Sequence, residues 1–467
     1  MNASLQPELT RRAVLGRLFG LGPLALAAML REERPGARSP AARARAVIWL
    51  NMTGAPSQFD TFEHKPLLAE LHGKPVPDEY MREQRFAFIA ADKRPNVLAS
   101  PWPMRQHGAC GAYVTDLLPE IAKVVDKVTF VRGMVTDEIN HVPAQLLFET
   151  GSPRMGRPAM GSWVTYGLGS ECKDLPGFVV LTSGKAGRCG TTCWGSGFLP
   201  SVYQGVQMRS SGDAVLGLSD PEGLSRGLRR ASLDTLQQLN TSRLAAVGDP
   251  EIAARIAAYE LAFRMQTSVP ELMDLRREPA AIRELYGVEP GKATFANHCL
   301  LARRLVERGV RFVELCHGGW DHHGGGDQNL VTDFPERCRQ VDRGTMALLV
   351  DLEQRGLLDQ TLVIWGGEFG RTPMLQGAYN EKDLGRDHLR TAFTILLAGG
   401  GVRRGASYGE TDPLGMSVVK QKVHVHDLQA TVLHLLGLEH TKLTYRYQGR
   451  DFRLTDVAGE VVTGVLE

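Results

Sequence analysis

Residues 362–368 read Leu-Val-Ile-Trp-Gly-Gly-Glu, which is four large apolar residues, two glycines and an acid. A short apolar run with β-branched residues that ends in glycines is typical of a buried strand followed by a turn. Comparable apolar runs occur in both directions along the chain, at 46–50, 128–132, 178–181, 310–315 and 392–398. The sequence therefore predicts a sheet of buried strands.

Helical patterns stand between these strands. Apolar residues at spacings of three and four predict a mainly helical section near 216–305 and further helices at 334–357 and 426–436. Alternating strands and helices favour an α/β fold with a mostly parallel sheet covered on both faces. Because no repeat or low-complexity linker interrupts the pattern, we expect one large domain over 46–467 rather than two.

The composition is that of a globular protein. The chain has 467 residues, of which 43% are hydrophobic and 23% charged, and this excludes a disordered or fibrous protein. The net charge of +2 is unevenly placed, since residues 1–45 hold eight arginines and three glutamates and leave the rest at −3. Residues 46–467 have a net charge near zero and therefore lack the excess of basic side chains that binds nucleic acid. Nucleic acid is disfavoured as a partner.

The amino-terminal segment accounts for this asymmetry. Arg11 and Arg12 precede an apolar stretch that runs to Leu30, which is typical of a twin-arginine export signal. We therefore interpret residues 1–45 as a leader and expect a periplasmic or extracellular protein. The stretch is too short and glycine-rich for a stable membrane span, and no other segment approaches one.

The seven cysteines do not predict a metal site. Cys189 and Cys193 are close enough for a local disulfide in an oxidising compartment, but a zinc site would need a second pair at suitable spacing. The odd count leaves at least one free thiol, and cysteine chemistry is taken as incidental to function.

Polar residues gather just past the predicted strand ends, where ligands bind in open α/β sheets. They are Asn51, Asp321, His322, His323, Glu368, Asp387 and His388. A further histidine pair, His424 and His426, lies beside Asp427. Mixed sets of histidine and carboxylate suit a borderline divalent cation, so the sequence predicts a zinc or manganese site.

Each of these residues also has a structural alternative. Asp321 and His323 stand in a glycine-rich loop that has little need of them for stability, which favours function. Glu368 follows a buried strand and needs a partner, which Arg371 could supply as a structural ion pair.

Asp387 and His388 lie between Arg386 and Arg390. This segment could bind an anion or a metal, or it could form a simple turn. The residues alone leave the three alternatives open.

Six stretches of the chain carry a family resemblance. They are VIWLNMTGAPSQFDTFEHKP (47–66), GGWDHH (318–323), GGEFGRTP (366–373), GRDHLRTAFTILLAGGGVRRG (385–405), VHDLQATVLHLLGL (425–438) and LTYRYQGRDFRLTDVAG (443–459). The chain resembles the DUF1501 family of exported bacterial proteins, which is related to the alkaline phosphatase and sulfatase superfamily. The resemblance implies a three-layer α/β/α sandwich like that of alkaline phosphatase.

The resemblance also implies that the usual nucleophile is missing. Sulfatase-like relatives carry Cys/Ser-x-Pro-Ser-Arg before a helix that ends in Thr-Gly, and this chain has His141 at the nucleophile's place, ahead of Pro143 and Thr150-Gly151. A formylglycine-type mechanism is therefore not expected.

Other superfamily positions are altered as well. Asn51 stands where the first strand usually ends in a metal-binding Asp, and Asp60 is a possible substitute. Where relatives have Asp-His-Gly, the carboxylate remains as Glu368 and the histidine is absent, so that His388 is the candidate for the lost nitrogen. Gln58 and Gln429 occupy positions where the family commonly has histidine.

Two functions remain open. In the first, the protein is a metal-dependent hydrolase of a phosphate or sulfate ester. His141 would act as a base, a phosphoryl acceptor or a ligand, and His426 would add a ligand or orient one. Arg371 and Arg386 would bind the anionic group of the substrate. The set of metal ligands would be Asp321, His323, Glu368 and His388. In the second, the fold has become a binding or accessory protein, for example for sulfated polysaccharide.

Overall fold

One nine-stranded sheet forms the centre of the part of the chain that the structure describes. The computed structural model describes residues 42–467 except 82–83, 91–92, 185–188, 211–212, 221 and 327. The strands follow the order β12-β4-β11-β8-β1-β7-β5-β6, with β15 also paired to β4. Their bounds are β1 (Ala46–Thr53), β4 (Val128–Val135), β5 (Phe178–Gly184), β6 (Val206–Met208), β7 (Phe312–Gly318), β8 (Thr361–Gly366), β11 (Phe393–Ala398), β12 (Ala406–Tyr408) and β15 (Val423–His424).

The sheet is mostly parallel, as the sequence predicts. β1 lies between β7 and β8 and is parallel to both, and β5 and β6 continue the parallel arrangement beyond β7. β11 runs antiparallel to both of its neighbours, β8 and β4. All eight residues of β1 are buried, because helices cover both faces of this central strand.

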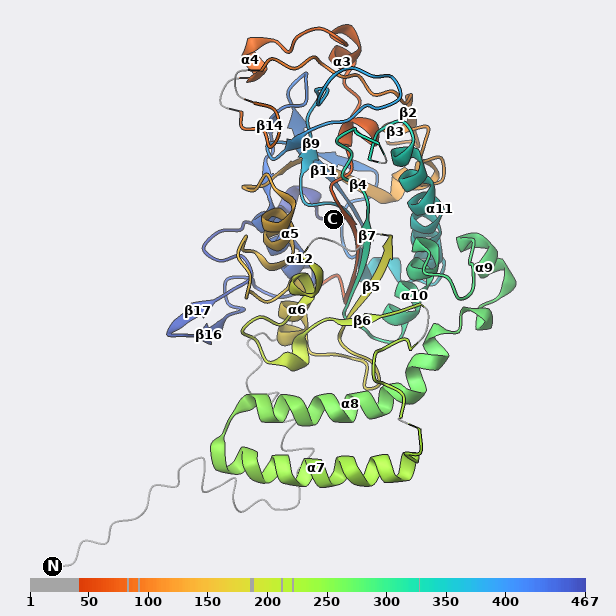
Figure 1. Ribbon diagram of the computed structural model, residues 1–467, viewed down its shortest axis with the longest axis vertical. Helices are drawn as coiled ribbons and strands as arrows, with labels where there is room; N and C mark the ends of the chain where they lie inside the picture. The colour runs from red at the N-terminus through yellow and green to blue at the C-terminus, as the bar shows by residue number, and fades with distance from the viewer. Residues whose placement is uncertain are drawn as a thin grey trace, which may run out of the picture.

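Helices cover the two faces of the sheet and make three layers (Figure 1). On one face, Ile48 and Leu50 of β1 share a hydrophobic cluster with α10 (Phe295–Glu307) and α11 (Asp333–Gln354). On the other face, Val47 and Trp49 join a cluster with α5 (His141–Thr150), α6 (Met160–Leu168) and α12 (Val425–Leu435). Successive side chains of a strand point to opposite faces, which places β1 in both cores. The predicted α/β/α sandwich is confirmed.

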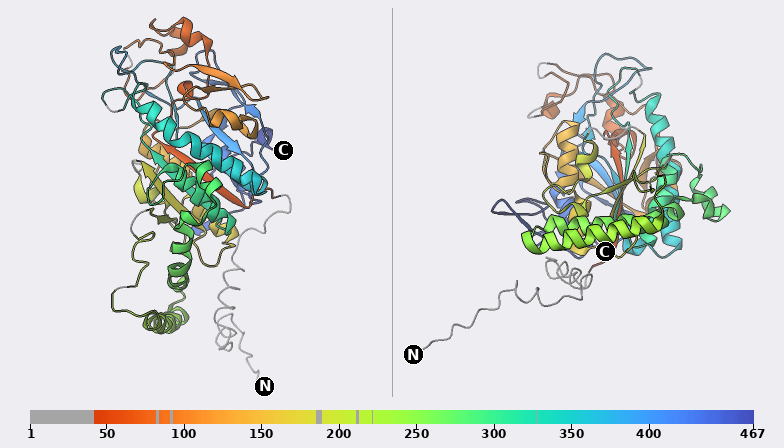
Figure 2. Two further views of the ribbon diagram at one scale, coloured as in Figure 1. Left: turned by 90° about the vertical axis from the view of Figure 1, so that its right-hand side faces the viewer. Right: turned by 60° about the horizontal axis from the view of Figure 1, so that its bottom comes forward.

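The predicted helical section contains a long hairpin. α7 (Arg226–Val247) and α8 (Pro250–Met273) pack side by side, and they lead through α9 (Ala280–Tyr286) to α10. Figures 1 and 2 show this hairpin standing away from the end of the sheet, at the bottom of the first view. Among the described residues, no helix combines the length and hydropathy needed to cross a membrane.

Glycines bring three loops into backbone contact at the carboxyl edge of the sheet. Gly54, after β1, has φ +105°, and a Cβ there would lie 2.9 Å from the backbone nitrogens of Trp320 and Asp321. A Cβ on Gly367, after β8, would lie 2.6 Å from the Met52 carbonyl oxygen. Since only glycine permits these approaches, the loops after β1, β7 and β8 are held together, and side chains on them converge.

Candidate metal centre

Four side chains from distant parts of the chain meet at this edge. His141 is the first residue of α5, Asp321 and His323 lie in the loop after β7, and His388 lies in the short strand β10 (His388–Leu389). One donor atom from each residue lies within 4.8 Å of the other three. The structure thus brings Asp321, His323 and His388 together and adds His141 to them.

A single carboxylate oxygen, Asp321 Oδ1, is at the middle of this cluster. It lies 2.7 Å from His323 Nε2, 2.9 Å from His141 Nε2 and 3.5 Å from His388 Nε2. The Nε2 atoms of His323 and His388 are 2.9 Å apart. Two imidazole nitrogens at this distance can share at most one proton, so lone pairs point into the centre.

The outer nitrogen of each imidazole is next to an acceptor. His141 Nδ1 is 2.7 Å from Glu368 Oε1, and His388 Nδ1 is 2.7 Å from the carbonyl oxygen of Ile139. His323 Nδ1 is 2.5 Å from Gln376 Oε1. These acceptors favour a proton on each Nδ1, which leaves the lone pair of each Nε2 available to bind a metal. This arrangement is found around metal-bound histidines.

The donor set fits a metal ion. His141 Nε2 is buried and faces Asp321 Oδ1 at 2.9 Å. With the ring proton on Nδ1, the nitrogen and the carboxylate oxygen would meet as two lone pairs, an arrangement that a bound cation relieves. Three imidazole nitrogens and one carboxylate oxygen are ligands that Zn²⁺ accepts, so this cluster could hold an ion of that kind.

Burial and nearby charges shift the protonation of three of the four cluster residues. Burial lowers the pKa of His388 to about 3, so its imidazole is neutral near neutral pH. Burial alone would raise the pKa of Asp321, but hydrogen bonds from the three histidines hold it well below its usual range. For His141, burial would lower the pKa, and the carboxylates of Asp321 and Glu368 outweigh this and raise it.

Arg371 neutralises the carboxylate of the centre. Its Nη2 lies 2.7 Å from Asp321 Oδ1, while its Nε donates to the Ala55 carbonyl at 3.0 Å and its Nη1 to the Arg386 carbonyl at 3.3 Å. The side chain is 1% exposed. Its N–H groups are thus engaged within the protein, and the anion-binding role of Arg371 stays a prediction. Its ion pair is with Asp321 rather than Glu368.

Glu368 lies one layer behind the cluster. Besides contacting His141, its Oε1 accepts from Gln145 Nε2 at 2.9 Å and from the Gly54 amide at 3.2 Å. It does not belong to the group of converging donor atoms. The structure places Glu368 against His141 Nδ1, and its role as a ligand stays a prediction.

Comparison with known proteins gives the family. The family described as "Protein of unknown function (DUF1501)" matches residues 44–466. The chain belongs to the DUF1501 family. No curated protein matches the sequence of this DUF1501 protein.

Solved structures are similar to the chain at low identity and low TM-score. They include the PsFucS1 sulfatase from Pseudoalteromonas sp., with 12% identity, TM-score 0.36, and coverage of 89% of this chain and 70% of that one. The lipoteichoic acid synthase LtaP from Listeria monocytogenes has 8% identity, TM-score 0.35, and coverage of 88% and 78%. Alkaline phosphatase from the Antarctic bacterium TAB5 has 11% identity, TM-score 0.30, and coverage of 77% and 92%. What the DUF1501 centre does is therefore argued from its own geometry.

Arg386 and Asp60 form a buried pair with each other. Arg386 Nε and Nη2 lie 2.7 and 3.2 Å from the two Asp60 oxygens, and Nη1 donates to the carbonyls of Leu98 and Thr372. Both charged side chains are 0% exposed. Each group is thus paired with the other, and the anion-binding role of Arg386 and the possible ligand role of Asp60 stay predictions.

Asp387 holds backbone rather than a metal. Its Oδ2 accepts from the amides of Phe88 and Ile89 at 2.8 and 2.9 Å, and its Oδ1 accepts from the His388 amide at 2.7 Å. The carboxylate thus ties the segment around residue 88 to the strand that carries His388. In the structure, His388 lies in the cluster with His141, Asp321 and His323. Asp387 instead accepts hydrogen bonds from backbone amides.

His322 and His426 point elsewhere. His322 Nε2 is 3.1 Å from Asp333 Oδ2, on α11. His426 Nε2 is 3.0 Å from the carbonyl of Gly151, which caps the carboxyl end of α5, while His141 is at the amino end. Ten helical residues rise about 15 Å, so His426 is too far from the cluster to be a ligand. The structure thus places His426 outside the four-residue cluster.

Asn51 bridges two buried acids beneath the site. Its Nδ2 is 2.8 Å from Glu149 Oε1 and 2.9 Å from Glu314 Oε1. Burial raises the pKa of both carboxyl groups, to about 7 at Glu314, so that they can share a site without full charge. Asn51 is therefore a bridging amide within β1 and not a metal ligand.

The two glutamines that depart from the usual family wording are also structural. Gln58 donates to the carbonyl of Arg371 at 2.9 Å and accepts from its amide at 2.8 Å. Gln429 donates to the carbonyls of Leu147 and Phe148 at 2.8 and 3.0 Å. Cys189 and Cys193 are both free thiols in the structure.

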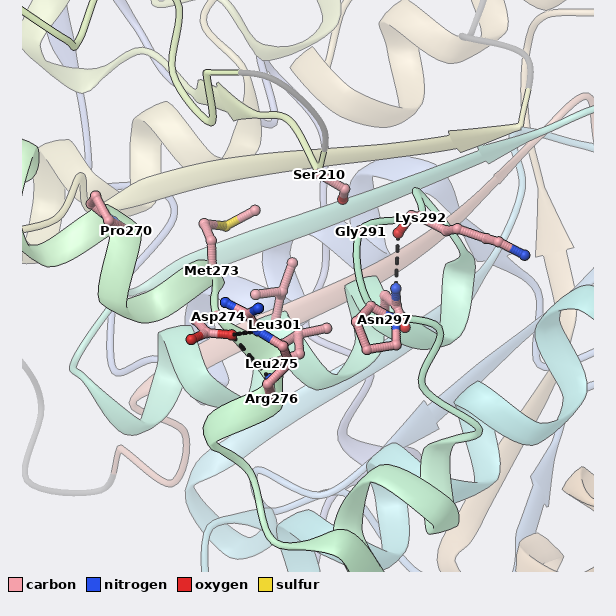
Figure 3. A pocket seen from close by; sticks show the side chains of 11 residues that line it. Ser210, Pro270, Met273, Asp274, Leu275, Arg276, Gly291, Lys292, Asn297 and Leu301 are labelled. Atoms are coloured by element: carbon pink, nitrogen blue, oxygen red, sulfur yellow. Dashed lines mark hydrogen bonds and ion pairs between the residues drawn. The ribbon is translucent and has the colours of Figure 1, made fainter.

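A hollow of about 410 Å³ lies apart from the cluster, between the end of α8 and the start of α10 (Figure 3). It is lined by residues such as Ser210, Met273 and Lys292 and includes none of the four cluster residues. The candidate functional site is therefore the cluster of His141, Asp321, His323 and His388, whose donor atoms converge.

Sequence reasoning missed Gln376, Gln145 and Phe88 as parts of the site. Gln376 and Gln145 act through single hydrogen bonds to His323 and Glu368, and glutamine at these positions carries no local signal. Phe88 lies in a segment of ordinary composition, and its ring centroid is 4.9 Å from that of His323. Only contacts between segments far apart in sequence reveal them.

Proposed function

We propose that this DUF1501 protein is an exported, metal-dependent hydrolase of phosphate or sulfate esters that works without a Ser, Thr or Cys nucleophile. The observation that carries the proposal is the convergence of three Nε2 atoms and one carboxylate oxygen within 4.8 Å. Acceptors behind all three imidazoles support it, since they prepare the nitrogens as ligands.

The residues would share the work as follows. His141, Asp321, His323 and His388 would hold a zinc or manganese ion, which when bound polarises an ester oxygen and lowers the pKa of water enough for direct attack. Glu368 would fix the orientation of the His141 ring through its contact with Nδ1, and Arg371 would offset the charge of Asp321.

We propose direct attack by water because the family resemblance places His141 where relatives carry their nucleophile. His141 contacts Glu368 through one nitrogen and Asp321 through the other, so both ring nitrogens are engaged within the centre. Of the three roles considered for His141, that of a metal ligand agrees best with this geometry.

The proposed substrate is a small anionic ester or a sulfated glycan, since a cationic centre attracts either. The proposed location is periplasmic or extracellular, after export by the twin-arginine segment, which lies outside the described residues. A signal of this kind carries folded protein, which suits an enzyme that takes up its metal before export.

The experiment compares two adjacent histidines. Purified wild-type protein, His323→Gln and His322→Gln are analysed for metal content and then assayed with 4-nitrophenyl phosphate, 4-nitrophenyl sulfate and carrageenan oligosaccharides. We expect about one ion per chain and ester hydrolysis in the wild type and in His322→Gln, and loss of both in His323→Gln. Equal metal content in the two variants would contradict the proposal.

A second candidate function is that of a binding or accessory protein on the same fold. The observation that favours it is that α5 begins with His141, where the family resemblance would place a Ser or Cys nucleophile. Metal bound at the cluster without hydrolysis of any ester, together with retention of a sulfated glycan, would support this alternative.

A further inference from the structure

One exposed aromatic side chain stands beside the metal cluster. Phe88 is 61% exposed, and its ring centroid lies 4.9 Å from that of His323 and 5.5 Å from that of His388. The two ring pairs are nearly perpendicular, at 79° and 77°. Phe88 therefore touches two of the four cluster residues and still leaves most of its surface open.

The position of Phe88 is fixed by its surroundings. The buried Asp387 carboxylate accepts from the amides of Phe88 and Ile89 and also from the amide of His388. On either side of Phe88, Phe86 and Ile89 pack against an apolar cluster that includes Phe59 and Val97. Because the neighbours are anchored inward and the backbone is held, Phe88 is directed outward next to the histidines.

Phe88 lies on the accessible side of the cluster. The side chains of His141 and His388 are 4% and 2% exposed, whereas that of His323 is 17% exposed. His323 is thus the most exposed of the three imidazoles, and Phe88 contacts its ring. A bound ligand would thus have the cluster at one end and an aromatic surface at the other.

We propose that Phe88 is the platform for the alcohol part of the substrate, and that this part contains a ring with a flat apolar face, as in a sugar or an aryl group. The inference rests on the proposed function, which assigns the anionic group of the ester to the metal cluster. Stacking on an aromatic ring recognises such a face and rejects a small acyclic group, so Phe88 sets specificity.

The test uses phosphonates, which bind as ester analogues and are not hydrolysed. Methylphosphonate, phenylphosphonate and the C6-phosphonate analogue of glucose 6-phosphate are titrated calorimetrically into the zinc-loaded full chain. We expect one or both ring compounds to bind the wild type about tenfold more tightly than methylphosphonate, which corresponds to about 1.4 kcal/mol. The two ring arms distinguish an aryl group from a sugar.

Three variants locate this preference. In Phe88→Ala the ratio of ring to methyl affinity should fall about tenfold, towards one. Phe88→Tyr keeps a stacking ring and should retain the ratio. Tyr447→Ala, which removes a 40% exposed aromatic from β16 (Tyr445–Tyr447), is the matched control and should retain it as well.

The outcomes separate the two proposals. If methylphosphonate binds and Phe88→Ala leaves the ring preference as in the wild type, or if no ring compound is preferred, the inference on Phe88 is overturned while the anion site stands. If none of the phosphonates binds the zinc-loaded protein, the proposed function fails and the inference fails with it.

Discussion

Replacing Glu368 with glutamine should weaken metal binding without removing a ligand. Glu368 is buried and its Oε1 lies 2.7 Å from His141 Nδ1, so the substitution removes the charge of that contact but keeps the shape of the side chain. Loss of an outer-shell partner of a metal-bound histidine typically costs 10–100-fold in affinity, or about 1.4–2.8 kcal/mol. We expect a reduction in zinc affinity within that range.

The assay is a competition titration of zinc against a chromophoric chelator, with stoichiometry from elemental analysis. Glu63→Gln is the matched control, because Glu63 is also a buried glutamate and interacts with Lys65, Arg132 and Thr411 instead of the cluster. In that variant the zinc affinity should equal that of the wild type, and about one ion should remain bound in both variants.

Two results would refute the reasoning. Wild-type affinity in Glu368→Gln would mean that the carboxylate does not orient His141. Complete loss of the ion, as expected for Asp321→Ala, would mean that Glu368 is a ligand after all.

Three further predictions follow from buried groups and from the leader. Burial lowers the pKa of His298 to about 4, below its unfolded value near 6.5. The free energy of unfolding should therefore fall as pH drops between these values, by about 1 kcal/mol per pH unit. Thermal melts of His298→Gln should show a flatter pH dependence than those of the wild type. Asp60→Ala should cost about 3–5 kcal/mol in urea unfolding, because it leaves the Arg386 charge buried and unpaired, and a cost below 1 kcal/mol would contradict this account. Replacing Arg11 and Arg12 with lysine should retain the protein in the cytoplasm on cell fractionation, and continued export would exclude a twin-arginine signal.

The fold could be read from the sequence because its signals are local. Apolar runs such as 46–50 and 362–365 form strands wherever helices cover them, and their alternation with helical segments favours a mostly parallel sheet. The short edge strands β6, β12 and β15 were not predicted, since three or two residues of mixed polarity carry no periodic signal.

The sequence by itself also determined which loops carry the chemistry. Asp321 and His323 follow a predicted strand, and carboxyl ends of parallel strands share one edge of a sheet. His388 comes before the strand β11, whose amino end lies at the same edge because β11 is antiparallel to β8. Their convergence, and the presence of His141 among them, required the tertiary structure, because the contacts join residues more than sixty positions apart.

Only the tertiary structure decided what each polar group does. Glu368 and His426 are residue types that bind metals. In the structure, Glu368 contacts His141 and His426 contacts the far end of α5. Arg371 and Arg386 are residue types that bind anions. In the structure, both form ion pairs with buried carboxylates. The physical reason is that a ligand is defined by the direction of a donor atom within a few ångströms, and that direction depends on packing between distant loops, which local sequence does not encode.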